Sequence, residues 1–250
     1  MEQLVKAFPE ARNGPARNEP DSRSVIRPDP GLPALTTRAL EDRKLIHRND
    51  SVRVQADAFR GLRTKLLALG AGRNTVVLVA PVQPGCGGSF VARNLAAAFA
   101  FDDTKTATLV DCDALHPSQH AALGVDVASG GMMEYLDGSI SDLGEIQYDS
   151  RLPRLRLVPS ATPRETTGEY FSSPRMRMMI DSLRGTHPNH HLILDGPPTL
   201  DSPDARILSE LADLVVLVAG YGQVTVERID DAAANFDPDK LAGVVFNNIY

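Results

Sequence analysis

A glycine-rich segment, Pro84 to Ser89, separates an apolar run from a helical pattern. The run VVLVA, from Val76 to Ala80, predicts a buried strand, and SFVARNLAAAFA, from Ser89 to Ala100, predicts a helix. Glycines let backbone N–H groups turn toward an anion, and a helix N-terminus adds about half a positive charge. This arrangement predicts a site that grips a polyphosphate.

The loop departs from the usual phosphate-binding sequence at one position. The pattern G-x-x-x-x-G-K-[ST] places its lysine at position 88, where this chain has Gly88. Removing one preorganised electrostatic donor typically lowers a rate by about 10² to 10³. We therefore expect binding through backbone amides together with impaired phosphoryl transfer. The predicted nucleotide-binding residues are Pro84, Gly85, Cys86, Gly87, Gly88, Ser89 and Phe90.

Three aspartates follow two further apolar runs. TATLVD ends in Asp111 and is followed by Cys112 and Asp113, while HLILD ends in Asp195. The carboxyl ends of parallel strands meet at one edge of a sheet, so these carboxylates are expected beside the glycine loop. Mg²⁺ prefers carboxylate, hydroxyl and phosphate oxygens. We expect Ser89 and Asp195 to hold the metal, whereas the other two aspartates could bind it, orient water or accept a proton.

The remaining apolar patterns alternate between strand and helix. Short runs at 152–159, 214–219 and 241–247 predict strands, and periodic segments at 52–69, 173–184 and 224–236 predict helices. This alternation predicts an α/β fold with a doubly wound, mostly parallel sheet and helices on both faces. Residues 1–40, rich in proline and polar residues, are expected to form a disordered tail, and residues 41–250 the folded domain.

Composition limits the function. The formal net charge of −6 disfavours a dedicated nucleic-acid binder, because such proteins are usually basic. We find no apolar run of about 18 residues and no secretory signal in the N-terminal residues. Two cysteines in 250 residues make no disulfide framework, which fits a reducing cytoplasm.

Two other groups of residues have alternative interpretations. Asp57, Arg60 and Arg63 lie three residues apart on one helical face and could form either a solvated charged surface or part of a subunit interface. In the loop, Cys86 could be a redox-sensitive thiol, although an ordinary loop residue accounts for it more simply. The histidines of THPNHH have no Cys or His partner at ligand spacing, so we expect no metal there.

Several segments resemble, in family order, the cytoplasmic domain of bacterial tyrosine kinases (BY-kinases) and the chain-length determinant proteins of exopolysaccharide export. VAPVQPGCGGSFVARNLAAAFA is similar to their Walker A segment, LVDCDALHPSQH to Walker A′ and LILDGPPTLDSPDA to Walker B. LVPSATPRETTGEYFSSPRM resembles the loop and helix before Walker B, and GVVFNN resembles the last strand. ADAFRGLRTKLL resembles their oligomerisation helix, E-x-x-R-x-x-R. The resemblance covers residues 44–250 and implies a P-loop NTPase-like fold.

The resemblance also implies roles for particular residues. Asp111 and Asp195 would serve Mg²⁺, Asp113 would accept the proton of the attacking hydroxyl, and the loop would bind the phosphates of ATP. Oligomerisation would involve Asp57, Arg60 and Arg63 in a homo-oligomer. The implied partner is a membrane-embedded polysaccharide co-polymerase, or chain-length determinant protein, which would hold this cytoplasmic protein at the inner face of the plasma membrane.

Three departures from the family pattern predict weak or absent tyrosine kinase activity. Gly88 replaces the Walker A lysine, Phe90 replaces a small hydroxyl residue, and Tyr250 alone stands where the family has a tyrosine cluster. Two alternatives follow. One is a nucleotide-independent scaffold for the co-polymerase. The other is a partition or septum-placement ATPase, a group with an additional lysine early in the loop, where this chain has Pro81 to Pro84.

Overall fold

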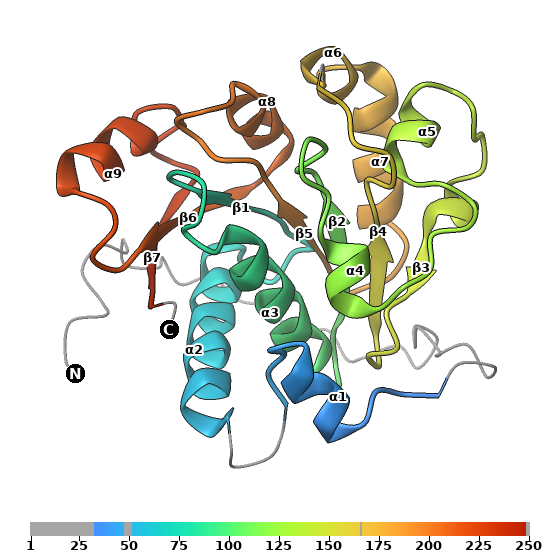
Figure 1. Ribbon diagram of the computed structural model, residues 1–250, viewed down its shortest axis with the longest axis horizontal. Helices are drawn as coiled ribbons and strands as arrows, with labels where there is room; N and C mark the ends of the chain where they lie inside the picture. Colours follow the sequence, from blue (N-terminus) through green and yellow to red (C-terminus); the bar gives the residue numbers. More distant parts are fainter. Residues whose placement is uncertain (1–32, 48–51, 166, 249–250) are drawn as a thin grey trace.

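The computed structural model describes residues 33–47, 52–165 and 167–248 and is built around a seven-stranded sheet (Figure 1). The strand order is β3-β4-β2-β5-β1-β6-β7, and every neighbouring pair is parallel except β3 with β4. This confirms the predicted α/β fold with a mostly parallel sheet. The strands are β1 (Val76–Pro81), β2 (Thr106–Asp111), β3 (Tyr148–Asp149), β4 (Leu155–Val158), β5 (His190–Asp195), β6 (Leu214–Gly220) and β7 (Leu241–Asn247).

The central strands arise from uninterrupted apolar runs. Every residue of β1, β2, β5 and β6 is buried, which requires helices on both faces of the sheet. The glycine loop leaves the sheet at the end of β1, between its neighbours β5 and β6. The order of the strands reverses direction around β1, which is where ligands bind in doubly wound sheets.

Right-handed crossovers place the helices on opposite faces of the sheet. One face carries α2 (Arg53–Leu69) and α3 (Gly88–Ala100), which pack against each other (Figure 1). The opposite face carries α7 (Pro174–Arg184), α8 (Asp204–Leu211) and α9 (Val226–Ala233). Shorter helices occupy the connections: α4 (Gln119–Leu123), α5 (Met132–Leu136), the 3₁₀ turn η2 (Leu143–Ile146) and α6 (Gly168–Phe171).

The folded part of the chain includes α1 (Thr37–Asp42). The boundary predicted between residues 40 and 41 falls inside this helix, and Leu40 is buried against the core. The segment that follows is tied to α3, because Ile46 N donates to Asn94 Oδ1 at 2.7 Å. Residues 1–32 of the predicted tail, and Tyr250, lie outside the described residues.

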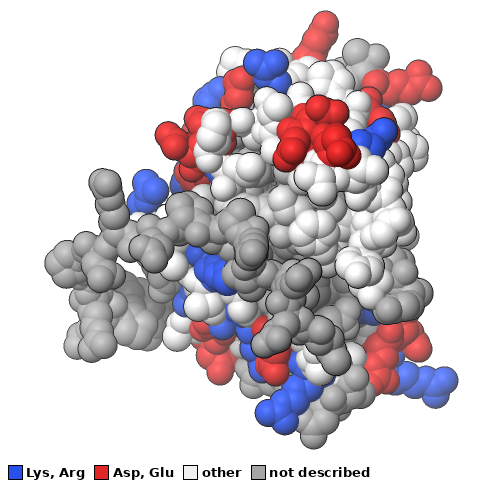
Figure 2. Space-filling view, turned by 90° about the vertical axis from the view of Figure 1, so that its left-hand side faces the viewer, with Lys and Arg blue, Asp and Glu red and all other residues white. Residues whose placement is uncertain are grey.

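Figure 2 shows the face that carries α9 and the edge strand β7. On this face Lys and Arg are scattered among Asp and Glu rather than gathered into one basic patch. Three large apolar side chains are exposed at this end of the sheet: Tyr221 after β6, Val226 in α9 and Phe246 in β7. Within the described part of the chain, we find no helix that combines the length and apolar character needed to cross a membrane.

Candidate functional site

The glycine loop joins the end of β1 to the first turn of α3. Gly85 and Gly87 both have φ of +81°, a conformation that side-chain-bearing residues rarely adopt. Gly87 is the N-cap of α3, and no side chain caps that helix end. Cys86 is buried, and its carbonyl accepts a hydrogen bond from Asn247 Nδ2 at 3.1 Å, which anchors the loop to β7. The loop thus presents an uncapped helix N-terminus, suited to an anion, at the carboxyl edge of the sheet.

Gly88 is enclosed by the end of β1. A Cβ at this position would lie 2.7 Å from Cδ and 2.8 Å from Cγ of Pro81. Pro81 is itself held in the sheet, because its carbonyl accepts a hydrogen bond from Thr199 N at 2.8 Å. The loop is therefore built around a glycine at position 88, and a lysine there would require Pro81 to move.

Asp111 and Asp195 end neighbouring strands and are direct partners in the parallel register of β2 and β5. Both carboxylates are fully buried. Asp111 Oδ2 accepts hydrogen bonds from the backbone N–H groups of Ser118 and Gln119, each at 2.9 Å. The second oxygens, Oδ1 of Asp111 and Oδ1 of Asp195, are buried without a hydrogen-bond partner. The prediction that these acids meet at one edge is therefore confirmed at the level of adjacent residues.

Gln119 connects the acid pair to the phosphate loop. Its side-chain amide Nε2 donates to Asp195 Oδ2 at 2.6 Å and to the carbonyl of Ser89 at 3.0 Å. Its Oε1 accepts a hydrogen bond from Arg93 on α3 at 3.2 Å. Gln119 is fully buried, so this one residue links β2, β5 and α3 beneath the site.

The electrostatics of the acid pair favour a bound cation. Burial raises the pKa of Asp111 well above its usual value, and the neighbouring charge of Asp195 raises it further. Burial likewise raises the pKa of Asp195 to about 7, although hydrogen bonds from Gln119 and the Ser89 hydroxyl lower it. Two buried carboxylates at paired positions of neighbouring strands repel each other when ionised, and a divalent cation would relieve that repulsion.

The donor set fits Mg²⁺ that arrives with phosphates. No group of three or more His, Cys, Asp or Glu side chains that could hold a metal occurs among the residues the structure describes. Nucleotide-bound Mg²⁺ needs only one or two carboxylates, since phosphates and water supply its other oxygens. The unpartnered oxygens of Asp111 and Asp195, with the hydroxyl of Ser89, could supply the protein's share.

A cleft of about 820 Å³ opens above these residues. One wall is the loop, including Pro84, Gly85, Gly87, Gly88 and Ser89, and the other is formed by residues that follow β5 and precede α8. Its acidic lining residues are Asp113, Glu165, Asp201 and Asp204. Among the described residues that line it, there is no Lys or Arg. The helix N-terminus and a bound cation could supply positive charge for phosphates, and His116 is the one other basic side chain among the described lining residues.

Asp113 lies in the wall of this cleft, and its catalytic role stays a prediction. Its side chain is 14% exposed, and Oδ1 accepts a hydrogen bond from His116 N at 3.2 Å. Phe90, by contrast, is directed away from the cleft and packs edge-on against Phe59 of α2, with 6.1 Å between ring centroids. A contribution of Phe90 to nucleotide binding would come from its backbone, and this role stays a prediction.

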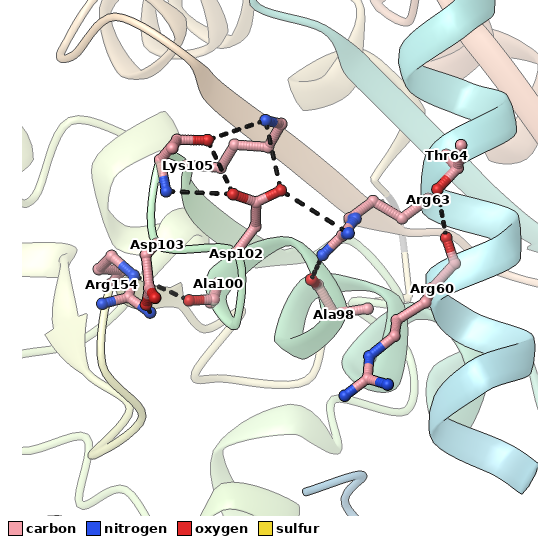
Figure 3. Close-up of polar contacts among 10 residues, drawn as sticks. Arg60, Arg63, Thr64, Ala98, Ala100, Asp102, Asp103, Lys105 and Arg154 are labelled. Carbon is pink, nitrogen blue, oxygen red and sulfur yellow. Dashed lines mark hydrogen bonds and ion pairs between the residues drawn. The ribbon is translucent and has the colours of Figure 1, made fainter. Parts of the chain in front are cut away.

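The three predicted oligomerisation residues do not share one environment. Asp57 and Arg60 form an exposed ion pair on α2, with 2.8 Å between Oδ1 and NH1. Arg63 instead turns toward α3 of its own chain: NH1 donates to the carbonyl of Ala98 at 2.8 Å, and NH2 lies 3.7 Å from Asp102 Oδ2. Figure 3 shows Arg63 reaching the end of α3 while Arg60 points away from that network. The oligomerisation role stays a prediction.

Neither cysteine is exposed in the site, and the buried His190 lies away from it, whereas His116 lines the cleft. Cys86 and Cys112 are both fully buried, and burial raises the pKa of the Cys112 thiol well above its usual value. His190 bonds through its two ring nitrogens to the hydroxyls of Thr106 and Thr108, at 2.7 and 3.1 Å. These contacts lie at the beginning of β5, at the opposite end of the strand from Asp195.

Sequence reasoning missed two residues of the site. The sequence patterns assign no role to Arg93 or to Gln119. Arg93 follows Ser89 by four positions, so helical geometry places both on the same face of α3. Gln119 opens a five-residue helix whose sequence has no usable periodicity, so no sequence signal identified it.

Comparison with curated proteins identifies tyrosine kinases. No protein-family model matches the chain. It is 33% identical over 198 residues to the putative tyrosine-protein kinase EpsB of Ralstonia solanacearum, covering 76% of this chain and 25% of EpsB. It is 25% identical over 193 residues to the tyrosine-protein kinase CpsD of Streptococcus agalactiae, covering 76% of this chain and 82% of CpsD. The chain thus spans about a quarter of the length of EpsB.

Solved structures share the fold. The kinase domain of the Escherichia coli tyrosine kinase ETK superposes with a TM-score of 0.73 at 20% identity, over 87% of this chain and 88% of that domain. A plasmid partition protein from Borrelia burgdorferi gives a TM-score of 0.52 at 19% identity, over 70% of this chain and 78% of that protein. At these identities the likeness concerns the fold, which is P-loop NTPase-like.

Proposed function

We propose a function from one premise: the curated homologues of this chain are bacterial tyrosine-protein kinases. The chain is a cytoplasmic BY-kinase-like protein that binds ATP with Mg²⁺ and regulates the synthesis and export of exopolysaccharide or capsule. Its tyrosine kinase activity is weak or absent. The observation that carries the nucleotide site is the pair of buried carboxylates, Asp111 and Asp195, at adjacent strand ends below the glycine loop.

Each part of the site has a role in this proposal. The N–H groups of the loop and the first turn of α3 bind the phosphates, and Ser89, Asp111 and Asp195 hold the metal. Bound Mg²⁺ supplies positive charge that neutralises the phosphate oxygens. Asp113, in the wall of the cleft, accepts the proton of an attacking hydroxyl.

Weak phosphoryl transfer follows from the charge of the cleft. No Lys or Arg occurs among its described lining residues, and Pro81 occupies the space that a side chain at Gly88 needs. Binding through amides and a metal survives this loss, because it does not use the lysine. Transfer loses an electrostatic contact worth about 10² to 10³ in rate, or more for a full cation on the transferred phosphate.

Calorimetry tests the nucleotide site. Millimolar ATP should bind only in the presence of Mg²⁺, and Asp195→Asn should weaken that binding about 10- to 100-fold, the usual effect of disturbing a metal site. A parallel autophosphorylation assay should give little or no phosphotyrosine. Absence of any Mg²⁺-dependent heat would remove the nucleotide-binding proposal, whereas efficient phosphorylation would remove only the claim of weak transfer.

The proposed partner is a membrane-embedded polysaccharide co-polymerase, and the protein lies at the inner face of the plasma membrane through it. Homology to CpsD and EpsB supports this partner. The chain also forms a homo-oligomer through the helix that bears Asp57, Arg60 and Arg63. Co-purification with a candidate co-polymerase, and sedimentation with and without that partner, test the two associations separately.

A nucleotide-independent scaffold is a second candidate, favoured by the acidic cleft without Lys or Arg among its described lining residues. The double variant Asp113→Ala, Asp195→Ala distinguishes the candidates in cells. A scaffold predicts undiminished polymer export in that variant, whereas a nucleotide-dependent regulator predicts its loss. The partition-type alternative rests on likeness of fold alone and has no lysine within Pro81 to Pro84 to support it.

A further inference from the structure

Arg93 is a buried cation beside the acid pair. It lies one turn beyond Ser89 on α3 and is 9% exposed. NH1 donates to Gln119 Oε1 at 3.2 Å, while Nε is buried without a hydrogen-bond partner. Arg93 is not among the residues that line the cleft, and the charges of Asp195 and Asp111 act on it.

Gln119 relays this contact to both acids. Its backbone N–H donates to Asp111 Oδ2 at 2.9 Å, and its Nε2 donates to Asp195 Oδ2 at 2.6 Å. An amide side chain can do this in only one orientation, with Oε1 toward the arginine and Nε2 toward the carboxylate. The contact of Arg93 with Oε1, together with the Ser89 carbonyl that accepts from Nε2, favours the orientation in which Nε2 faces Asp195. Asp195 Oδ1 has no hydrogen-bond partner.

The contact of Arg93 matters because the arginine carries a positive charge and both neighbouring carboxylates are buried. Asp111 and Asp195 together carry two negative charges when ionised, and both are fully buried. Burial lowers the pKa of Arg93, while the charges of Asp195 and Asp111 act to raise it. An uncompensated buried charge is strongly destabilising, so loss of the Arg93 charge would leave the ionised carboxylates without the compensation that it gives them.

We propose that Arg93 is the built-in counter-ion of the Asp111–Asp195 pair and, through Gln119, a positioning residue for Asp195. This positive charge lies inside the fold and does not line the cleft, so it does not replace the phosphate-contacting lysine that is missing at position 88. The inference rests on the proposed function only in treating the acids as metal ligands. The pairing itself can be measured without nucleotide.

A double-mutant cycle measured by thermal unfolding in metal-free buffer tests this pairing. Arg93→Met keeps an apolar stem but removes the charge, and we expect the melting temperature to fall by about 10 °C. In an Asp111→Asn background, which removes one of the two negative charges, the same substitution should lower it by less than half as much. Millimolar MgCl₂ should raise the melting temperature of Arg93→Met by more than it raises that of the wild type.

Arg63→Met is the matched control, because Arg63 is also a partly buried arginine that contacts α3 but lies at its far end. Its effect should be the same with and without the Asp111→Asn substitution. An equal fall for Arg93→Met in the two backgrounds would overturn the proposal and leave Arg93 a packing residue. Should Arg93→Met not fold, Arg93→Lys decides: near-wild-type stability supports a counter-ion, and comparable unfolding contradicts it.

Failure of this inference and failure of the proposed function give different results. If the chain binds Mg²⁺-ATP but Arg93 and Asp111 show no coupling, the proposed function stands and the counter-ion proposal fails. If the coupling is present but calorimetry shows no heat of ATP binding, the counter-ion proposal stands and the nucleotide site fails.

Discussion

The ring of Pro81 occupies the space that a side chain at Gly88 would need, with 2.7 Å between Pro81 Cδ and the position of a Cβ on residue 88. Non-bonded carbon atoms do not approach this closely, so Pro81 or residue 88 would have to move. The absence of the phosphate-loop lysine is therefore accompanied by a second feature at the end of β1 that fits the glycine. The two positions have to be altered together if the lysine is to be restored.

Gly88→Lys alone should not restore phosphoryl transfer. We expect it to destabilise the protein by about 1–3 kcal/mol, the usual effect of overpacking, as should Gly88→Ala, which isolates the contribution of the Cβ. Adding Pro81→Ala removes the two nearest atoms and should recover most of the loss in both variants. Denaturant unfolding measures stability and an autophosphorylation assay measures transfer. A stable and active single Gly88→Lys variant would show that the strand end adapts freely.

Asp195→Asn should affect stability and binding in opposite directions. Burial raises the pKa of Asp195 to about 7, so ionisation at pH 8 opposes folding in the absence of a cation. The neutral amide should therefore make the metal-free protein about 1–3 kcal/mol more stable at pH 8, while weakening Mg²⁺-dependent ATP binding. Asp201→Asn, at the rim of the same cleft, is the control for binding. A loss of both stability and binding would contradict the account of the pair as a prepared cation site.

Gln119→Met should destabilise the protein because it leaves buried polar groups unsatisfied. Asp195 Oδ2 loses its 2.6 Å donor and Arg93 NH1 loses its acceptor. We expect the free energy of unfolding to fall by about 1–3 kcal/mol, and toward the upper value because both partners are charged. Ala121→Met, on the exposed side of the same short helix, should change stability by less than about 0.5 kcal/mol. Equal effects of the two substitutions would argue against the relay.

His190 should make stability depend on acid pH. Burial lowers its pKa to about 3 in the folded protein, against about 6.5 in the unfolded chain. Above pH 6.5 both states are neutral, so the contribution of His190 is complete. As the pH falls from 6.5 toward 3, only the unfolded chain takes up the proton, and stability falls by about 1.4 kcal/mol per unit.

The comparison of wild type with His190→Gln isolates this contribution. The raised pKa values of the acid pair act in the opposite direction over part of the same range, and they are common to both proteins. The stability advantage of the wild type should therefore shrink steadily between pH 6.5 and pH 4 in equilibrium denaturation. An advantage that stays constant across this range would mean that His190 titrates normally in the folded state.

Arg60 and Arg63 should respond differently to truncation. Arg63→Ala removes the donor to Ala98 and the partner of Asp102 at the end of α3, so stability should fall by about 1–2 kcal/mol (Figure 3). Arg60→Ala removes only an exposed ion pair and should change monomer stability by less than about 0.5 kcal/mol. Sedimentation of Arg60→Ala therefore reports on assembly without a stability effect. Unchanged assembly in that variant would exclude Arg60 from the subunit interface.

The course of the sheet could be predicted from the sequence because its strands are continuous apolar runs. β1, β2, β5, β6 and β7 all lie where such runs predicted them, and α2, α3, α7 and α9 lie on the periodic segments. Acids at the ends of parallel strands must share an edge with the glycine loop, so the general location of the site followed from local patterns. The short helices α4, α5 and α6 were missed because four or five residues carry no periodic signal.

Only the tertiary structure decided how these parts meet. Strand order makes β2 and β5 neighbours, and their register sets Asp111 directly against Asp195. The same packing joins Arg93 and Gln119 to the pair, places Pro81 over Gly88 and turns Arg63 toward α3. Each of these contacts forms only when the whole sheet and its crossovers are assembled. The sequence therefore determined which residues could bind a phosphate and a cation, and the fold determined which other side chains contact them.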